Sequence, residues 1–123
     1  MNEINGELRD HLITEVLEHF IGNLPRTRSG SGYYLPMHTR SSFVENIAIA
    51  FHKMHTLLVH DLWFMGQTQW SKTIFTFILE RRIDQWSGAG LAGVRLRNKE
   101  DKKQFMALIV KDVQRMENFL SSY

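Results

Sequence analysis

The sequence predicts an all-α protein, a four-helix bundle of up-down-up-down topology with long glycine-rich first and third connections. Four segments repeat apolar residues with the 3.6-residue period of a helix, and no alternating strand-like run competes with them. Glycine, serine and proline gather between these segments. At 123 residues, 43% of them hydrophobic, the chain is expected to form a single domain over residues 1–123.

The first two helices have clear boundaries. An apolar stripe from Leu8 to Leu24 predicts the first helix, which Pro25 ends. Ser42 followed three residues later by Glu45 is a capping-box pattern, in which each side chain satisfies the other residue's backbone N–H, and it predicts the start of the second helix. That helix is expected to end at Gly66, with a tight turn over residues 66–68.

The third helix is predicted from about residue 69 to residue 86, and the fourth begins after Asn98, a favourable N-cap. Two of the three connections, residues 25–40 and 87–97, are long and rich in glycine. In an up-down-up-down bundle the first and third connections lie at the same end. We therefore expect both of these segments at one pole of the molecule.

Charge is distributed unevenly along the chain. Residues 25–40 carry +3 and residues 81–99 carry +4, whereas the whole chain carries only +2. The remainder is therefore acidic, and much of that charge lies on the first helix, including Glu15 and Glu18. The folded protein is expected to have one strongly basic pole.

Arginine forks bind phosphate in a bidentate manner, and tyrosine rings stack on unpaired bases. The residues predicted to bind nucleic acid or another anion are Arg26, Arg28, Tyr33, Tyr34, Arg40, Arg81, Arg82, Arg95, Arg97 and Lys99. Two other interpretations stay open. These charges also suit an acidic protein partner, and they also fit a role limited to complementing helix dipoles and keeping the connections soluble.

The second and third helices are apolar around most of their circumference, whereas a helix in an isolated bundle leaves one side to solvent. This pattern predicts a homo-oligomer or a protein partner. The predicted interface residues are Ile49, Val59, Trp63, Trp70 and Phe77. The alternative is that residues 25–40 fold back over these helices as a lid.

No catalytic motif is present, so no enzymatic activity and no cofactor are expected. The chain contains no cysteine, and His52 and His55 lack further ligands on the same helical face, so no metal site is predicted. The absence of cysteine fits a cytoplasmic protein. There is no apolar run of about 18 residues, so no membrane association is expected.

Three segments carry a resemblance to a known family. They are Leu-Pro-Arg at 24–26, "SSFVENIAIAF" at 41–51 and "KQFMALIVKDVQRMENFL" at 103–120. Their layout resembles the four-helix-bundle family that includes the accessory variability proteins of diversity-generating retroelements and the proteins encoded in ribosomal-RNA intervening sequences. The resemblance implies an oligomeric bundle that associates with nucleic acid. It implies no catalytic residues.

Taken together, these observations predict a non-catalytic accessory or regulatory protein that presents a basic pole to RNA, DNA or another anionic partner. An alternative is a protein-binding regulator, such as an inhibitor or immunity-like factor, that acts through the aromatic surface of the second and third helices. A further alternative is a magnesium-dependent nucleotide hydrolase that uses Glu15 and Glu18.

Overall fold

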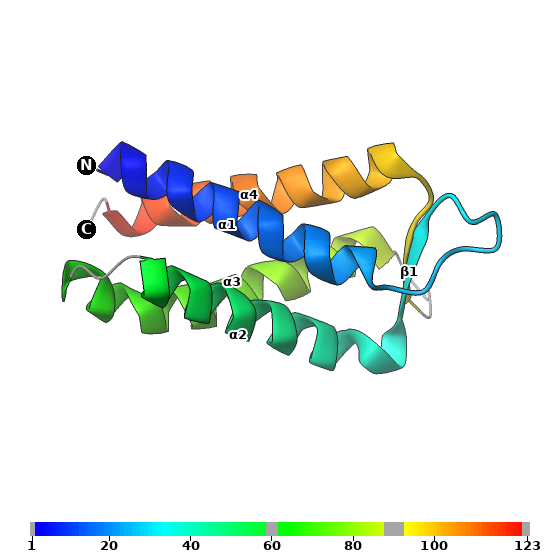
Figure 1. The fold of residues 1–123 in the computed structure, drawn as a ribbon, viewed down its shortest axis with the longest axis horizontal. Helices are drawn as coiled ribbons and strands as arrows, with labels where there is room; N and C mark the ends of the chain where they lie inside the picture. Colours follow the sequence, from blue (N-terminus) through cyan, green and yellow to red (C-terminus); the bar gives the residue numbers. More distant parts are fainter. Residues whose placement is uncertain (1, 59–61, 88–92, 122–123) are drawn as a thin grey trace.

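The computed structural model describes the backbone of residues 2–58, 62–87 and 93–121 (Figure 1). Within these residues the chain forms four α-helices, two short strands and one turn of 3-10 helix. In chain order the elements are α1 (Asn2–Gly22), β1 (Tyr33–Pro36), η1 (Met37–Thr39), α2 (Arg40–Leu58), α3 (Leu62–Ser87), β2 (Gly93–Leu96) and α4 (Lys99–Ser121). The prediction of four helices is confirmed.

The helices lie side by side, and each packs against two others (Figure 1). α1 contacts α2 and α4, and α3 also contacts α2 and α4. α1 begins and α4 ends at one end of the molecule, while β1 lies at the opposite end (Figure 1). We call this opposite end, which carries β1 and β2, the sheet end. No helix in the described residues is long and apolar enough to cross a membrane.

β1 and β2 form a small antiparallel sheet, so the expectation of a purely α-helical fold is corrected. The paired residues are Tyr33 with Leu96, Tyr34 with Arg95, Leu35 with Val94 and Pro36 with Gly93. Leu35, Val94 and Leu96 are buried and join the core, whereas Arg95 and Arg97 are exposed. The sheet therefore closes one end of the core, and it brings the two long connections to the same pole, as expected.

The core runs along the inside of the bundle and is made of the apolar stripes that the sequence predicts. Each of the four helices contributes large side chains that are almost completely buried. Examples are Leu17 and Ile21 of α1, Ile47 and Phe51 of α2, Leu79 and Ile83 of α3, and Phe105 and Ile109 of α4. This core fixes the positions of the four helices, and so it also fixes the helix ends from which the two long connections extend.

Two predicted boundaries are wrong. Gly66 lies inside α3, which runs through the predicted turn at residues 66–68, and α2 ends at Leu58. An interior glycine costs a helix only about 1 kcal/mol relative to alanine, which tertiary packing offsets. Ser42 lies within α2 rather than at its start, because the 3-10 turn η1 leads directly into the helix at Arg40. Ser42 and Glu45 therefore do not form an N-terminal cap.

The start of α4 is as predicted. The Asp101 backbone N–H donates to the Asn98 side-chain oxygen at 2.9 Å, which is the bond expected of an N-cap. The Lys102 backbone N–H donates to the Asn98 carbonyl oxygen at 3.2 Å. The helix therefore begins directly after β2, and its first turn lies beside the sheet.

Candidate functional site

The connection between α1 and β1 is an ordered turn rather than an open loop. The Tyr34 N–H donates to the Pro25 carbonyl oxygen at 2.8 Å, and the Thr27 N–H donates to the Gly32 carbonyl oxygen at 3.1 Å. Gly30 closes the tip: its N–H donates to the Thr27 carbonyl oxygen at 2.8 Å, and its φ of 76° is a conformation that favours glycine. The chain therefore doubles back over residues 25–34.

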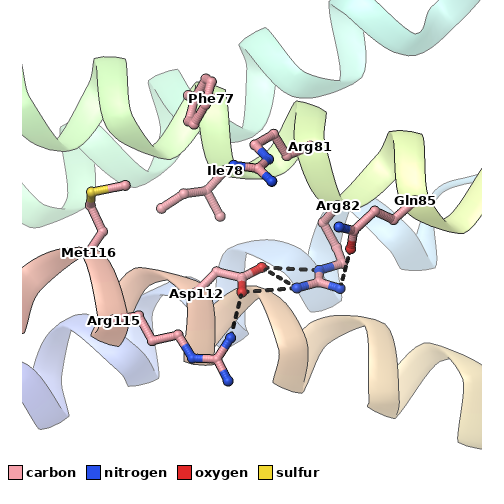
Figure 2. Close-up of a pocket in the computed structure, with 8 residues that line it drawn as sticks. All are labelled: Phe77, Ile78, Arg81, Arg82, Gln85, Asp112, Arg115 and Met116. Atoms are coloured by element: carbon pink, nitrogen blue, oxygen red, sulfur yellow. Dashed lines mark hydrogen bonds and ion pairs between the residues drawn. The ribbon is translucent and has the colours of Figure 1, made fainter.

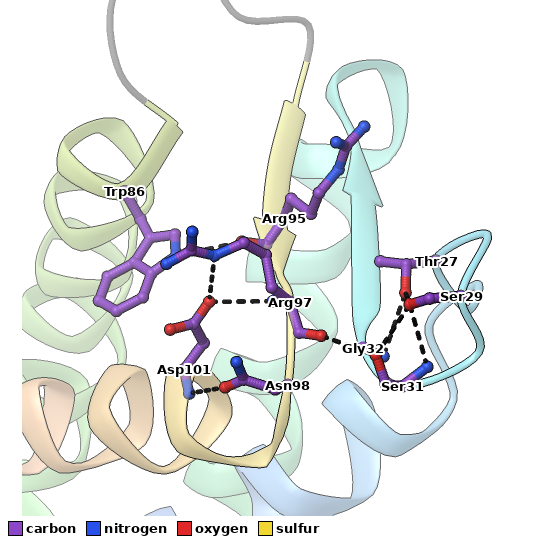
Figure 3. A network of polar contacts seen from close by, with 9 residues as sticks. All are labelled: Thr27, Ser29, Ser31, Gly32, Trp86, Arg95, Arg97, Asn98 and Asp101. Carbon is purple, nitrogen blue, oxygen red and sulfur yellow. Dashed lines mark hydrogen bonds and ion pairs between the residues drawn. The ribbon is translucent and has the colours of Figure 1, made fainter.

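Hydroxyl groups stabilise the tip of this turn (Figure 3). The Ser29 and Ser31 hydroxyls are 2.8 Å apart, and the Thr27 hydroxyl accepts a hydrogen bond of 3.1 Å from the Gly32 N–H. Ser31 also donates to the carbonyl oxygen of Arg97 at 3.1 Å. That bond joins the turn to the residue that follows β2, so the two connections are fixed to each other.

Gly32 is required by close packing of two backbones. A Cβ built on Gly32 would collide with the carbonyl oxygen of Leu96 and with the backbone of Arg97. Gly93 is in the same position on the other strand, where a Cβ would collide with the carbonyl oxygen of Leu35. Two of the glycines that sequence patterning assigned to loose connections therefore allow the strands to approach.

A hollow of about 440 Å³ opens on this sheet-end surface. It lies between the α1–β1 turn and β2. We call it the basic hollow, and it is lined by Arg26, Thr27, Arg28, Ser29, Tyr34, Arg95 and Arg97. Five of the ten predicted anion-binding residues therefore line the hollow. They are four arginines, two from each of the two connections, and Tyr34 of β1.

The arginines of the basic hollow differ in how they are held. The Arg26 guanidinium donates to the Gly30 carbonyl oxygen at 2.6 Å and lies 4.4 Å from the centroid of the Tyr33 ring. The Lys102 ammonium lies 5.2 Å from the same centroid. Of the two tyrosines predicted to bind nucleic acid, Tyr34 lines the hollow, whereas Tyr33 lies beside Arg26 and is not among the lining residues.

Arg97 is paired with a carboxylate. Its side-chain Nε and its backbone N–H each donate to Asp101 at 3.0 Å (Figure 3). The hydrogen bonds from the Arg97 side chain and backbone hold the pKa of the Asp101 carboxyl below its ordinary value, because they stabilise the ionised form. The Arg97 side chain is nevertheless 75% exposed, so its outer nitrogens face solvent.

Arg28 and Arg95 make no ion pair with any residue that the structure describes, and both are exposed. In Figure 3 the Arg95 side chain points away from the Arg97–Asp101 pair. Among the described residues, therefore, no side chain or backbone group occupies the donors of these two guanidiniums.

The other predicted anion-binding residues do not line the basic hollow. Arg40 forms an ion pair with Asp84 at 2.5 Å and donates to the Glu80 carbonyl oxygen at 3.2 Å. Lys99 is exposed at the start of α4 but does not line the hollow. The last two, Arg81 and Arg82, face α4 instead.

Arg82 is held by Asp112 across the α3–α4 contact (Figure 2). The guanidinium donates to both carboxylate oxygens of Asp112 at 2.8 to 3.0 Å, and the two side chains are only 17% and 20% exposed. Its third nitrogen donates to the Gln85 side-chain oxygen at 2.6 Å. Arg82 therefore joins α3 to α4, and each of its three nitrogens already has an acceptor.

The predicted interface residues are placed only in part. Phe77 is 49% exposed and Ile49 is half-buried. Trp63 and Trp70 belong to α3, but their side chains lie outside the described residues, as does all of Val59. Residues 25–36 lie at the sheet end and not along α2 and α3, so they do not form the alternative lid (Figure 1).

The acidic pair considered for magnesium has other contacts. Glu18 forms an ion pair with Lys102 at 2.7 Å, and Glu15 lies 3.8 Å from His11. Within the described part of the chain, no group of three or more His, Asp or Glu side chains is arranged to hold a metal ion. The pair Glu18–Lys102 instead links α1 to α4.

Several residues that shape the site are not among the sequence predictions. Thr27 and Ser29 line the basic hollow, and Asp101 partly neutralises Arg97. The spacing of four residues between Arg97 and Asp101 could have indicated this ion pair at the start of α4. Thr27 and Ser29 carry no comparable signal, because hydroxyl residues are common in turns of every kind. No protein-family model, curated protein or solved structure matches this chain.

Proposed function

We propose that this protein is a non-catalytic accessory or regulatory protein that binds nucleic acid at the basic hollow. The observation that carries the proposal is that the sheet brings arginines from two distant connections around one hollow. Arg28 and Arg95 have no carboxylate partner among the described residues, and they lie on backbones that are already fixed. A preorganised cluster loses little conformational entropy when it binds phosphate.

Each group in the hollow suits one part of a nucleotide. The guanidiniums of Arg28 and Arg95 offer two parallel N–H donors to a phosphate. The Thr27 and Ser29 hydroxyls add neutral donors at the same surface. The Tyr34 ring offers a face on which one base stacks, a contact worth about 1 to 3 kcal/mol.

We extend the proposal to the topology, the cellular location and the assembly of the protein. The helices form an up-down-up-down bundle in the cytoplasm, and copies associate through α2 and α3. The family resemblance supports the same assembly, because it implies an oligomeric bundle that associates with nucleic acid. None of these steps requires a cofactor or a chemical reaction at the hollow.

The test is a titration of fluorescently labelled RNA and DNA, single-stranded and duplex, at several salt concentrations. For each phosphate neutralised, log affinity should fall by about 0.7 to 0.9 per tenfold rise in salt. Arg28→Gln combined with Arg95→Gln should reduce this slope by about 1.4 to 1.8. Arg81→Gln combined with Arg115→Gln removes two exposed arginines that do not line the hollow, so it is the matched control and should leave the slope unchanged.

Two results would contradict the proposal. One is the absence of binding, or binding that does not respond to salt. The other is an equal loss of affinity in the Arg28/Arg95 variant and in the Arg81/Arg115 variant, since that would reflect total charge rather than the basic hollow. Circular dichroism of each variant checks that the helices are intact.

A second candidate function is protein recognition through α2 and α3, which the 49% exposure of Phe77 favours. In this proposal a second copy of the chain, or a partner protein, covers the aromatic residues of these helices. Trp63→Ala and Trp70→Ala should then lower the mass measured by light scattering, while the Arg28/Arg95 variant keeps the wild-type mass. An unchanged mass at all concentrations would exclude self-association by this surface.

A further inference from the structure

A second concavity lies between α3 and α4, away from the basic hollow (Figure 2). It has a volume of about 490 Å³, and its lining residues are all different from those of the hollow. We call it the α3–α4 cleft. Clefts of about 300 to 1,000 Å³ with an apolar lining and a few polar groups are typical small-molecule sites.

The floor of the α3–α4 cleft is apolar. Phe77 is 49% exposed, which is unusual for a large aromatic side chain. Ile78 beside it is buried, and Met116 of α4 is half-buried on the other side of the cleft (Figure 2). These three side chains line the cleft, and a hydrocarbon group displaces water favourably from apolar surface of this kind.

The carboxylate in the cleft is already neutralised. Both carboxylate oxygens of Asp112 accept hydrogen bonds from the Arg82 guanidinium, at 2.8 to 3.0 Å. Because this pair is mostly buried and bidentate, Asp112 presents little negative charge to an incoming anion. Repulsion by Asp112 therefore does not prevent an anionic ligand from entering.

Two further arginines flank the apolar floor and have weaker partners. The Arg81 guanidinium lies 5.7 Å from the centroid of the Phe77 ring and makes no ion pair with a described residue. Arg115 is 69% exposed and approaches Asp112 only at 4.0 Å. Three arginines around one aspartate leave the cleft with a net charge of +2. It therefore complements an anion that also carries an apolar group.

The length of the cleft distinguishes between possible ligands. On α3 it extends from Phe77 to Gln85, a rise of about 12 Å, and on α4 only from Asp112 to Met116. A helix that docks in a groove uses anchors over at least two turns of both surfaces, and a specific protein interface buries about 800 Å² on each side. The α3–α4 cleft is too short on α4 for such a partner, and it suits a small amphiphile.

We propose that the α3–α4 cleft binds an unesterified medium-chain fatty acid. The carboxylate lies between Arg81 and Arg115, and the hydrocarbon chain lies on Phe77, Ile78 and Met116. Arg82 takes no part in binding the head group, because Asp112 holds it. The site is independent of the basic hollow and of any nucleic acid bound there.

The first experiment is calorimetric titration of the full chain with hexanoate, octanoate and decanoate. Each added methylene that is buried in the cleft should lower Kd about fourfold, so decanoate should bind about 16-fold more tightly than octanoate. Decyltrimethylammonium, which carries the same chain with the opposite charge, should bind much more weakly than decanoate. No binding of decanoate, or equal binding of the cationic amphiphile, would overturn the proposal.

Variants then assign the site. Arg81→Gln with Arg115→Gln should weaken decanoate binding about tenfold or more, because both head-group partners are removed. Phe77→Gln should reduce the dependence on chain length, whereas Phe77→Leu should largely retain it. The Arg28/Arg95 variant is the matched control, since it removes the same charge from the basic hollow, and it should bind decanoate like the wild type.

All the substituted side chains are exposed by a third or more, so the variants should fold, and circular dichroism verifies this. Light scattering in the same samples tests the competing occupant. If Phe77→Gln lowers the mass of the protein while decanoate leaves it unchanged and does not bind, a second copy covers the cleft and the proposal is wrong. Undiminished decanoate binding in the Arg81/Arg115 variant would also overturn it.

Discussion

The basic hollow and the α3–α4 cleft both gather arginines, yet Arg82 of the cleft is held by other side chains whereas Arg28 and Arg95 of the hollow are not. In the hollow, Arg28 and Arg95 have no carboxylate partner among the described residues and lie on a turn and a strand. In the cleft, Arg82 is bound through three nitrogens by side chains of α3 and α4. Arg28 and Arg95 are available to ligands, whereas Arg82 stabilises the fold.

The difference shows that the number of arginines in a segment does not determine how many can bind a ligand. Arg82 and Arg95 fall in the same basic segment of the sequence, 13 residues apart. Arg82 meets a carboxylate because α4 packs against α3, whereas Arg95 lies on the exposed face of β2. The basic pole is therefore smaller than total charge predicts. The following predictions test this division.

The largest effect should come from the glycines that allow the strands to approach. Gly32→Ala or Gly93→Ala places a Cβ against a carbonyl oxygen of the neighbouring strand and should cost about 2 to 3 kcal/mol of unfolding free energy. Urea unfolding measures this loss, and nucleic-acid affinity should fall with it because the hollow is built on the sheet. Gly22→Ala, where nothing lies within 4 Å of the new Cβ, is the control and should change little. Similar stabilities for all three variants would show that the strands tolerate separation.

The next effect concerns the arginine that stabilises the fold. Arg82→Ala leaves Asp112 without its bidentate partner in a mostly buried position and should cost about 2 kcal/mol. Arg115→Ala, an exposed side chain 4.0 Å from the same aspartate, should cost less than about 0.5 kcal/mol. A double-mutant cycle with Asp112→Ala measures the coupling energy. If Arg82→Ala instead lowers nucleic-acid affinity at unchanged stability, the two arginine groups do not differ as described.

A smaller effect is expected at the start of α4. Asn98→Ala removes the acceptor of the Asp101 N–H and should lower the unfolding free energy by about 1 kcal/mol. Lys99→Ala, one residue further on and exposed, serves as the control and should be close to neutral. Chemical unfolding of the two variants compares them directly, and equal values would mean that the cap is not needed to hold β2 beside α4.

The smallest effect concerns Asp101, and its sign follows from the lowered pKa. Since Arg97 lowers that pKa in the folded protein, the carboxylate stabilises the fold above the unfolded pKa of about 3.9. This contribution is lost as the pH falls through the lower folded pKa. Asp101→Asn should therefore remove that part of the acid dependence of stability, as measured by urea unfolding at a series of pH values.

Asp101→Asn also tests whether pairing with a carboxylate keeps an arginine of the basic hollow from binding phosphate. Asp101→Asn removes the carboxylate that pairs with Arg97, so one more guanidinium of the basic hollow becomes available to phosphate. The salt slope of nucleic-acid binding should then rise by about 0.7 to 0.9. A slope that stays at the wild-type value would show that Arg97 already contacts phosphate while paired, or that it does not take part.

Much of the helical architecture follows from local patterns. The stripe ending at Leu24 and the Asn98 cap predicted α1 and the start of α4 correctly, because both depend on residues within one or two turns. The sheet was not predicted, since each strand has only four residues and is stabilised mainly by its partner. Alternation of Val94 and Leu96 with Arg95 and Arg97 was its signal, but such short alternation also occurs in loops.

The candidate site could be predicted only in outline. Sequence patterning brought the two connections to one pole and named Arg26, Arg28, Arg95 and Arg97, which line the hollow. It also placed Arg81 and Arg82 there, although they face α4. Nothing in the sequence near Arg82 indicates its partner, because Asp112 is 30 residues away.

The sequence by itself determined four helices, their apolar faces and the meeting of two basic connections, because these features depend on local periodicity and on the order of elements along the chain. The tertiary structure alone decided which arginines are paired, which tyrosine faces the hollow and where glycine is required. Those outcomes depend on contacts between residues far apart in sequence, such as Ser31 with the Arg97 carbonyl and Arg82 with Asp112. The helix or strand propensity of a short segment depends on its own residues, so it does not indicate contacts with residues far away in the sequence.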